Sequence, residues 1–173
     1  MNLVIKNTIR LILMMFIQAF IMQRIPPLHQ FIVPYFYFAF ILWLPFKISR
    51  MQLLWIAFLT GLLVDMFYKT PGLHAADSLL IGYTRPFLIT LLLPKEATEW
   101  GNQEPTQKNM GSVPYWTYMV FMTLLHHFWM ILLEWMQFGS FFYFIGKLIA
   151  TSLLSLLLIL ITDLFLNRNA KLR

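Results

Sequence analysis

The chain has 173 residues, of which 60% are hydrophobic and only 12% are charged, and its mean hydropathy is +0.70. A soluble domain carries about 25% charged residues. The composition therefore excludes a soluble protein with one anchor and predicts a single all-helical membrane domain over residues 1–173. The formal net charge is +6, but the basic residues stand singly at the ends of apolar runs, where they mark topology rather than a nucleic-acid site. The absence of cysteine excludes disulfides, thiolate catalysis and cysteine-bound metals.

Six apolar segments are long enough to be membrane-spanning helices, which need about 20 residues each. In chain order they are residues 3–22, 29–46, 51–68, 72–93, 114–138 and 141–166. The first segment has no signal-peptide cleavage site after it, so we expect it to remain as a span. The second is rich in aromatic residues and contains Pro34. Residues 94–113 are polar and too few for a core of their own, so we expect a cytoplasmic connector there.

Lysine and arginine are distributed unevenly over the connections between these segments. With six spans and a cytoplasmic N-terminus, two basic residues lie outside, Arg24 and Lys69. Nine lie inside, namely Lys6, Arg10, Lys47, Arg50, Lys95, Lys108, Arg168, Lys171 and Arg173. Cytoplasmic connections of membrane proteins carry such an excess of positive charge. The distribution predicts that both termini are cytoplasmic.

The stretch from Gly61 to Gly82 places ionisable and small residues within otherwise apolar sequence. A charge at the centre of a bilayer costs about 2.5–3.5 kcal/mol on insertion scales, so these side chains need partners, water or a function. Gly61 and Asp65 share one face of a helix, and Lys69 is placed to pair with Asp65 one turn later. A Pro-Gly turn then reverses the chain into the fourth predicted span.

The fourth span begins with small and ionisable residues. Asp77 near its start complements the helix dipole, and the small-xxx-small pairs Gly72/Ala76 and Ser78/Gly82 allow close helix approach. Two interpretations remain open: an interior hairpin whose charges satisfy each other, or a polar corner, open to the outside, that receives a ligand or a partner helix. The candidate residues of this corner are Gly61, Asp65, Gly72, His74, Ala76, Asp77 and Gly82.

Ionisable residues also occur in other predicted spans. Arg85 precedes Pro86, which kinks a helix by removing a backbone hydrogen bond. We expect the Arg85 side chain either to snorkel towards the cytoplasm or to pair with Asp163. Glu134 and Lys147 flank a short outer connection at comparable depth and are predicted to form an ion pair.

The sequence contains no set of residues with a recognised catalytic spacing. His126 and His127 point about 100° apart on a helix, and no HExxH motif accompanies them, so a zinc site is not expected. The GxSxG elbow, the P-loop, the Asp-rich array of membrane phosphatidyltransferases and the Gly-x-Ser-Gly of rhomboid-type proteases are also missing. The sequence predicts neither an enzyme nor a metal or cofactor site.

The segment from Gly61 to Gly82 resembles the bacterial rod shape-determining protein MreD family. In that pattern a span ends Gly-x-x-x-Asp, and a short turn, Gly-Leu-His-Ala and a small-residue-rich span with a further glycine follow. The matching residues are Gly61, Asp65, residues 72–75 and Gly82. Length and number of spans are similar as well, and the turn at residues 69–71 resembles the variant of Bacteroidota-type bacteria.

The resemblance implies a non-catalytic scaffold of the bacterial inner membrane. It would belong to the cell-elongation (Rod) complex, which regulates cell shape and peptidoglycan synthesis. The implied partner is the single-span protein MreC, which connects to cytoplasmic MreB filaments and to RodA with its transpeptidase. The family's six-helix fold is similar to the S-components of energy-coupling-factor vitamin transporters, so the rival interpretation is a subunit that binds a small molecule. The short outer connections offer little material for a lid over such a ligand, and we prefer the scaffold.

Overall fold

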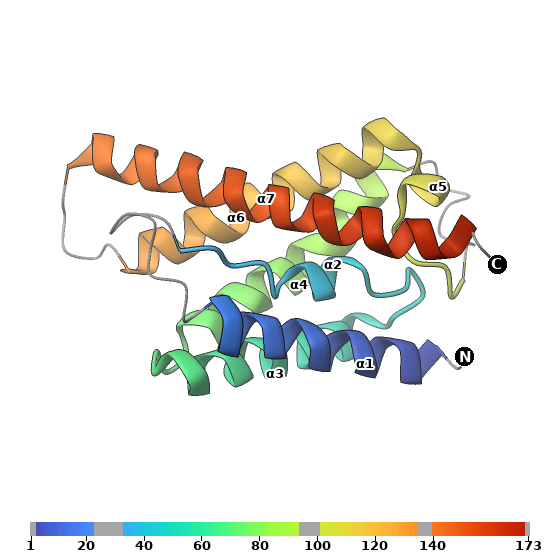
Figure 1. The fold of residues 1–173 in the computed structure, drawn as a ribbon, viewed down its shortest axis with the longest axis horizontal. Helices are drawn as coiled ribbons and strands as arrows, with labels where there is room; N and C mark the ends of the chain where they lie inside the picture. The colour runs from blue at the N-terminus through green and yellow to red at the C-terminus, as the bar shows by residue number, and fades with distance from the viewer. Residues whose placement is uncertain (1–2, 23–32, 94–100, 135–139, 172–173) are drawn as a thin grey trace.

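The computed structural model describes residues 3–22, 33–93, 101–134 and 140–171. Within these ranges the regular elements are all helices, which confirms the all-α fold class. They are α1 (Leu3–Phe16) with its continuation the π-helix η1 (Ile17–Ile21), α2 (Ala39–Leu42), α3 (Arg50–Tyr68), α4 (Leu73–Leu92), α5 (Gln107–Met110), α6 (Ser112–Glu134) and α7 (Phe141–Lys171). Figure 1 shows both termini and α5 at one end of the molecule and the turn between α3 and α4 at the other.

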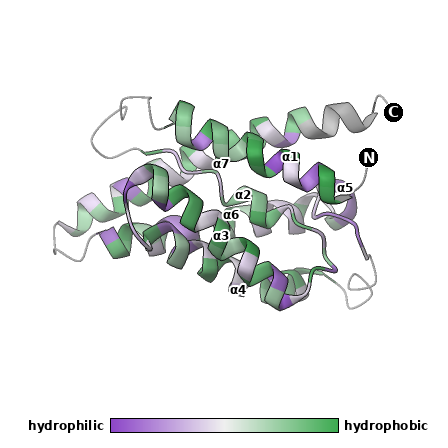
Figure 2. Ribbon diagram, turned by 90° about the horizontal axis from the view of Figure 1, so that it is seen from below, coloured by the Kyte–Doolittle hydropathy of each residue, from purple (hydrophilic) through white to green (hydrophobic). Residues whose placement is uncertain are grey.

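Four helical segments are long and apolar enough to cross a membrane: Val4–Ile21, Arg50–Tyr68, Ser112–Glu134 and Phe141–Phe165. The chain is therefore a membrane protein. Figure 2 shows mainly hydrophobic residues along α1, α3 and α7 and hydrophilic residues at α5. The segment predicted as the fourth span forms the 20-residue helix α4, which is not among these four, so its crossing of the membrane stays a prediction.

The boundaries predicted for the other helical spans agree with the structure to within a few residues. Predicted segment 3–22 is α1 with η1, segment 51–68 is α3, segment 114–138 begins as α6 at Ser112, and segment 141–166 is the first part of the longer α7. Residues 135–138 of the fifth segment and 94–100 of the polar connector lie outside the described residues.

The helical span predicted at residues 29–46 is wrong over the part that the structure describes, residues 33–46. This broken segment contains only the four-residue helix α2 and is otherwise irregular. Pro34 and Pro45 stand near its two ends. A proline lacks the N–H that a helix needs, and it disfavours helical backbone in the residue before it. The two prolines therefore limit the helix to one turn between them.

The broken segment runs through the interior, and every residue from 34 to 45 is buried. Irregular backbone at membrane depth is tolerated only where protein surrounds it and supplies partners. Gln18 in η1 is one such partner: its Nε2 donates to the carbonyl of Pro34 at 3.2 Å, and its Oε1 accepts from the N–H of Phe36 at 3.1 Å. The amide thus replaces two hydrogen bonds that a continuous helix would have made.

Arg85 of α4 holds the other end of the broken segment. Its guanidinium donates to the carbonyl oxygens of Leu42 (3.5 Å), Leu44 and Pro45 (3.4 Å), while the hydroxyl of Tyr118 in α6 donates to Leu42 at 3.0 Å. Only 2% of Arg85 is exposed. The expectation that Arg85 snorkels to the membrane surface is therefore wrong, because main-chain carbonyls inside the protein satisfy it.

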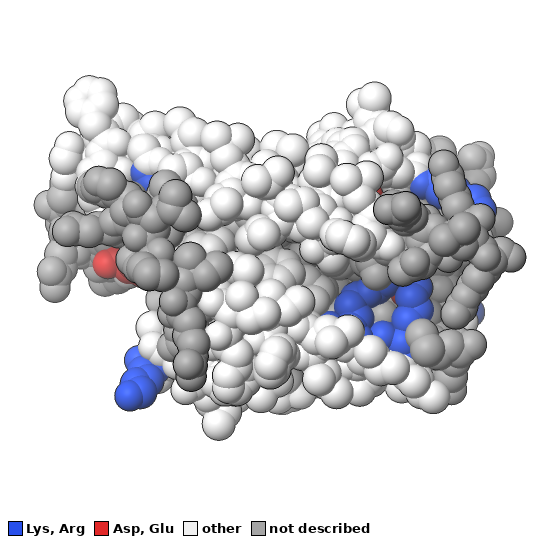
Figure 3. Space-filling view, in the orientation of Figure 1, with Lys and Arg blue, Asp and Glu red and all other residues white. Residues whose placement is uncertain are grey.

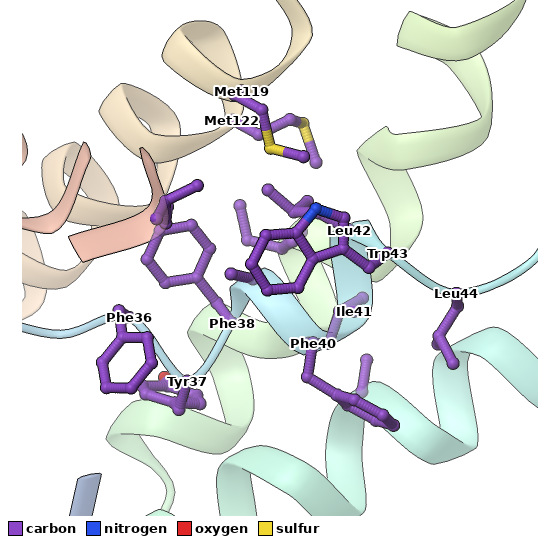
Figure 4. Packing of buried hydrophobic residues seen from close by; sticks show 14 of the residues in the cluster. Phe36, Tyr37, Phe38, Phe40, Ile41, Leu42, Trp43, Leu44, Met119 and Met122 are labelled. Carbon is purple, nitrogen blue, oxygen red and sulfur yellow. The ribbon is translucent and has the colours of Figure 1, made fainter. Parts of the chain in front are cut away.

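The side chains of the broken segment form the centre of the hydrophobic core. Figure 4 shows its aromatic residues between the surrounding helices, with Met119 and Met122 of α6 facing Leu42 and Trp43. Around this centre α3 packs on α4, α4 on α6, and α6 on α7, while α1 packs near α2. The hairpin of α3 and α4 thus lies against the core with one side and carries its turn at one end of the molecule.

Candidate functional site

Asp65, near the end of α3, holds the first turn of α4. Its carboxylate accepts hydrogen bonds from the Thr70 hydroxyl at 3.0 Å and from the main-chain N–H groups of Gly72 (3.1 Å), His74 (2.9 Å) and Ala75 (3.0 Å). The first N–H groups of a helix have no partner within the helix, and its dipole favours negative charge there. Asp65 therefore caps α4 from the preceding helix, and only 3% of it is exposed.

Two residues with positive φ make the turn between the helices. Lys69 ends α3 with φ 57°, and its N–H donates to the carbonyl of Asp65; Gly72 precedes α4 with φ 88°. Glycine adopts such angles without steric cost, which explains its presence at position 72. The Lys69 side chain is exposed and forms no ion pair with any described residue. The predicted pairing of Lys69 with Asp65 is therefore wrong.

Two glycines allow α3 and α4 to approach closely. A Cβ atom on Gly61 would overlap the carbonyl oxygen of His74 and would lie 2.6 Å from the Cα atom of Ala75. A Cβ atom on Gly82 would lie 2.9 Å from the Cβ atom of Ala57. Small residues at helix interfaces in membranes permit such main-chain contact. The hairpin is thus packed tightly at two levels along its length.

A second group of polar side chains lies in the interior beside the hairpin. The hydroxyl of Tyr37, in the broken segment, hydrogen-bonds with Nδ1 of His74 at 3.2 Å and with Nε2 of His126 at 3.3 Å. The same Nε2 lies 2.8 Å from Oδ2 of Asp77. We call Tyr37, His74, Asp77 and His126 the interior polar cluster. All four have 0% exposure, and together they join α4, α6 and the broken segment.

The interior polar cluster is incompletely hydrogen-bonded in the described part of the chain. Nε2 of His74, Oδ1 of Asp77 and Nδ1 of His126 are buried without a hydrogen-bond partner there. Asp77 and His126 have the form of an acid–base couple, and their contact joins α4 to α6 in the interior.

The seven residues of the predicted outer corner separate into two groups. Five of them are buried, namely Gly61, Asp65, His74, Asp77 and Gly82, and two are exposed, namely Gly72 and Ala76. The Asp65 carboxylate binds main-chain N–H groups at the start of α4, whereas the side chains of His74 and Asp77 contact Tyr37 and His126 in the interior. The described residues do not form a polar pocket in which these side chains face outward.

The other ion pair predicted near this end of the molecule is present. Lys147 Nζ donates to Glu134 Oε2 at 2.7 Å, across the ends of α6 and α7. Asp163, the alternative partner predicted for Arg85, accepts a hydrogen bond from the hydroxyl of Tyr115 at 2.8 Å. His127 hydrogen-bonds with Ser155 at 2.9 Å. A group of three side chains suited to a metal ion does not occur among the described residues.

Three residues with structural roles were not predicted from the sequence. Gln18, Tyr37 and Tyr118 each bind the broken segment or lie in it. A signal for Gln18 exists, because a single amide within an apolar span needs a partner. The two tyrosines give no such signal, because aromatic residues make up 17% of this chain.

Comparison with known proteins finds no matching family model, no significantly similar curated protein and no significantly similar solved structure.

Proposed function

We propose that the chain is a non-catalytic scaffold of the bacterial inner membrane, an MreD-like component of the cell-elongation complex. The observation that carries this proposal is the use of Asp65. The motif that resembles the MreD family centres on this carboxylate, and its four hydrogen bonds all come from the turn and the first residues of the next helix. A motif whose carboxylate makes these contacts stabilises the hairpin of α3 and α4.

The surface of the hairpin suits contact with other membrane helices. The outer face of α3 is apolar, with large exposed side chains at Trp55, Leu59, Leu62 and Met66. The exposed residues near the turn include Gly72 and Ala76, which are small enough for another helix to come close. The buried charges keep their partners inside, so a lateral partner would not have to desolvate them.

The mechanism of such a scaffold is positional. A single-span, MreC-like partner that contacts the hairpin would be held at a fixed place, and differential contacts would favour an assembled state of the complex. The MreB-like filament and the RodA-like synthase with its transpeptidase would be connected indirectly. The proposal includes cytoplasmic termini, which the excess of Lys and Arg at that side supports.

Purification of the tagged full-length chain from native membranes tests this function. We expect a single-span membrane protein to copurify in stoichiometric amount after mild detergent extraction. The rival function is that of a vitamin-transporter S-component. Recovery with transporter ATPases and a stoichiometric small ligand, in place of a single-span protein, would overturn the proposal.

A further inference from the structure

A groove separates α1 and α7, the first and last membrane-spanning helices. Its volume is about 430 Å³. Its walls are formed by apolar side chains of α1, among them Ile9 and Leu13, and of α7, among them Leu158 and Ile161, and its floor includes Phe36 of the broken segment. Both helices are long and apolar enough to cross a membrane, so a groove between them lies against lipid.

One end of this groove is basic. Lys6 and Arg10 line it there, at the end of the molecule that carries both termini, and Figure 3 shows Lys and Arg side chains around a hollow in this face. Both cations contact one oxygen of Glu104, at 2.8 Å for Lys6 Nζ and 3.0 Å for Arg10 Nη2. Two cations and one carboxylate leave one positive charge in excess.

The three side chains are arranged as a fixed site. Nη1 of Arg10 donates a hydrogen bond to the main-chain carbonyl of Trp43 at 3.4 Å, and Cζ of Arg10 lies 5.8 Å from the centre of the Trp43 ring. The side chain of Lys6 is 42% exposed and open to a ligand. Glu104 is buried and does not line the groove, so it holds the two cations from behind. The site therefore offers cations for an anion.

We propose that the groove between α1 and α7 binds an anionic glycerophospholipid. The phosphate binds Lys6 and Arg10, and an acyl chain lies along the apolar walls. Basic pockets between membrane helices bind anionic headgroups in this way. The site is independent of the proposed partner and requires only that the chain lies in a membrane.

The size of the groove favours an acyl chain over a partner helix. A helix with side chains is about 10 Å across and rises 1.5 Å per residue, so each residue fills about 120 Å³. A groove of about 430 Å³ would then enclose fewer than four residues of an inserted helix. An acyl chain is thinner and fits lengthwise, with its headgroup at the basic end.

Native mass spectrometry of the full-length protein with added lipid tests the proposal. The probes are phosphatidylglycerol and phosphatidylcholine of identical acyl chains. We expect one phosphatidylglycerol to be retained at collision energies that remove phosphatidylcholine. Lys6→Gln should reduce its retention about fivefold, the effect of about 1 kcal/mol for one cation near a membrane surface, whereas Lys108→Gln, which removes an exposed charge from α5, should leave it unchanged.

A second pair of variants tests the apolar part of the groove. Ile161→Trp fills it, and Leu160→Trp adds the same bulk at a neighbouring position that does not line it; their exposures are similar, at 40% and 38%. We expect only Ile161→Trp to abolish retention of phosphatidylglycerol. Equal retention of both lipids, equal effects of the two tryptophans, or displacement of the lipid by a copurified membrane helix would overturn the proposal.

Discussion

The carboxylate of Asp65 in α3 accepts a hydrogen bond of 2.9 Å from the main-chain N–H of His74, nine residues later in α4. This hydrogen bond fixes the orientation of the Asp65 carboxylate, the charged group of the sequence motif. It turns the carboxylate towards the start of the next helix and away from lipid. The Asp65 carboxylate is thereby satisfied within the hairpin of α3 and α4.

Replacement of Asp65 by leucine should destabilise the protein without preventing its insertion. Three main-chain N–H groups, that of Gly72 before α4 and those of His74 and Ala75 in its first turn, would lose their acceptor, and a buried donor left unpaired costs about 1–3 kcal/mol. Asp65→Asn should lose less, because asparagine also caps helices well. The free energy of unfolding in mixed micelles measures the difference.

The control for this prediction is Glu134→Gln, which removes a carboxylate from the exposed pair with Lys147. Exposed ion pairs contribute about 0–1 kcal/mol, so this variant should unfold close to the wild type. If Asp65→Leu were as stable as Glu134→Gln, the cap would not hold the hairpin.

Gly61→Ala should separate α3 from α4. The added methyl group would overlap the carbonyl of His74, and overpacking of this kind costs about 1–3 kcal/mol. Gly146→Ala is the matched control, because a Cβ atom there has no neighbour within 4 Å and alanine is the better helix former. The thermal unfolding midpoint should fall for Gly61→Ala and rise slightly for Gly146→Ala; a fall of equal size in both would contradict the close contact.

Arg85→Leu should release the broken segment from the core, because three buried carbonyl groups lose their donor. The chain contains no cysteine, so Leu44→Cys introduces a single thiol at a position that is 3% exposed. We expect maleimide to label this thiol slowly in the otherwise unchanged protein and rapidly when Arg85→Leu is added. Arg85→Lys should give an intermediate rate, because lysine retains donors but not the planar fork.

A matched control for the labelling is Arg50→Leu, which removes an exposed cation at the start of α3. This change should leave the thiol at position 44 protected. Persistent protection in Arg85→Leu would mean that packing of the aromatic side chains alone holds the segment.

The sequence predicts a helix well where a continuous apolar run of sufficient length sets its ends. The bounds of α3 and the start of α7 follow from continuous apolar runs between polar residues, and Gly61, Asp65 and Gly72 mark the hairpin through their spacing. The segment at residues 33–46 is predicted wrongly because its composition is equally apolar. What makes it irregular is the pair of prolines together with donors from distant positions, Gln18 and Arg85, and tertiary contacts of this kind leave no local pattern.

The residues of the candidate site could be predicted in part from the sequence, but their contacts could not, because these depend on tertiary structure. Asp65 and His74 stand out as ionisable residues in apolar spans, and the Pro-Gly pair between them predicts a turn. That Tyr37 would lie between His74 and His126 could not be read from the sequence, because it depends on where the broken segment passes. The direction of the charges, inward rather than outward, is likewise a property of the packed hairpin.

The most direct test of the proposed function is photo-crosslinking in native membranes from position 76. Ala76 is exposed in the first turn of α4, and unlike Gly72 it has ordinary backbone geometry that accepts a photoreactive side chain. The matched control is Leu91, which is 79% exposed near the other end of the same helix. We predict that position 76 captures a single-span membrane protein, that position 91 captures much less, and that Asp65→Leu reduces the yield at position 76. Capture of no single-span protein above the level at position 91 would contradict the scaffold function.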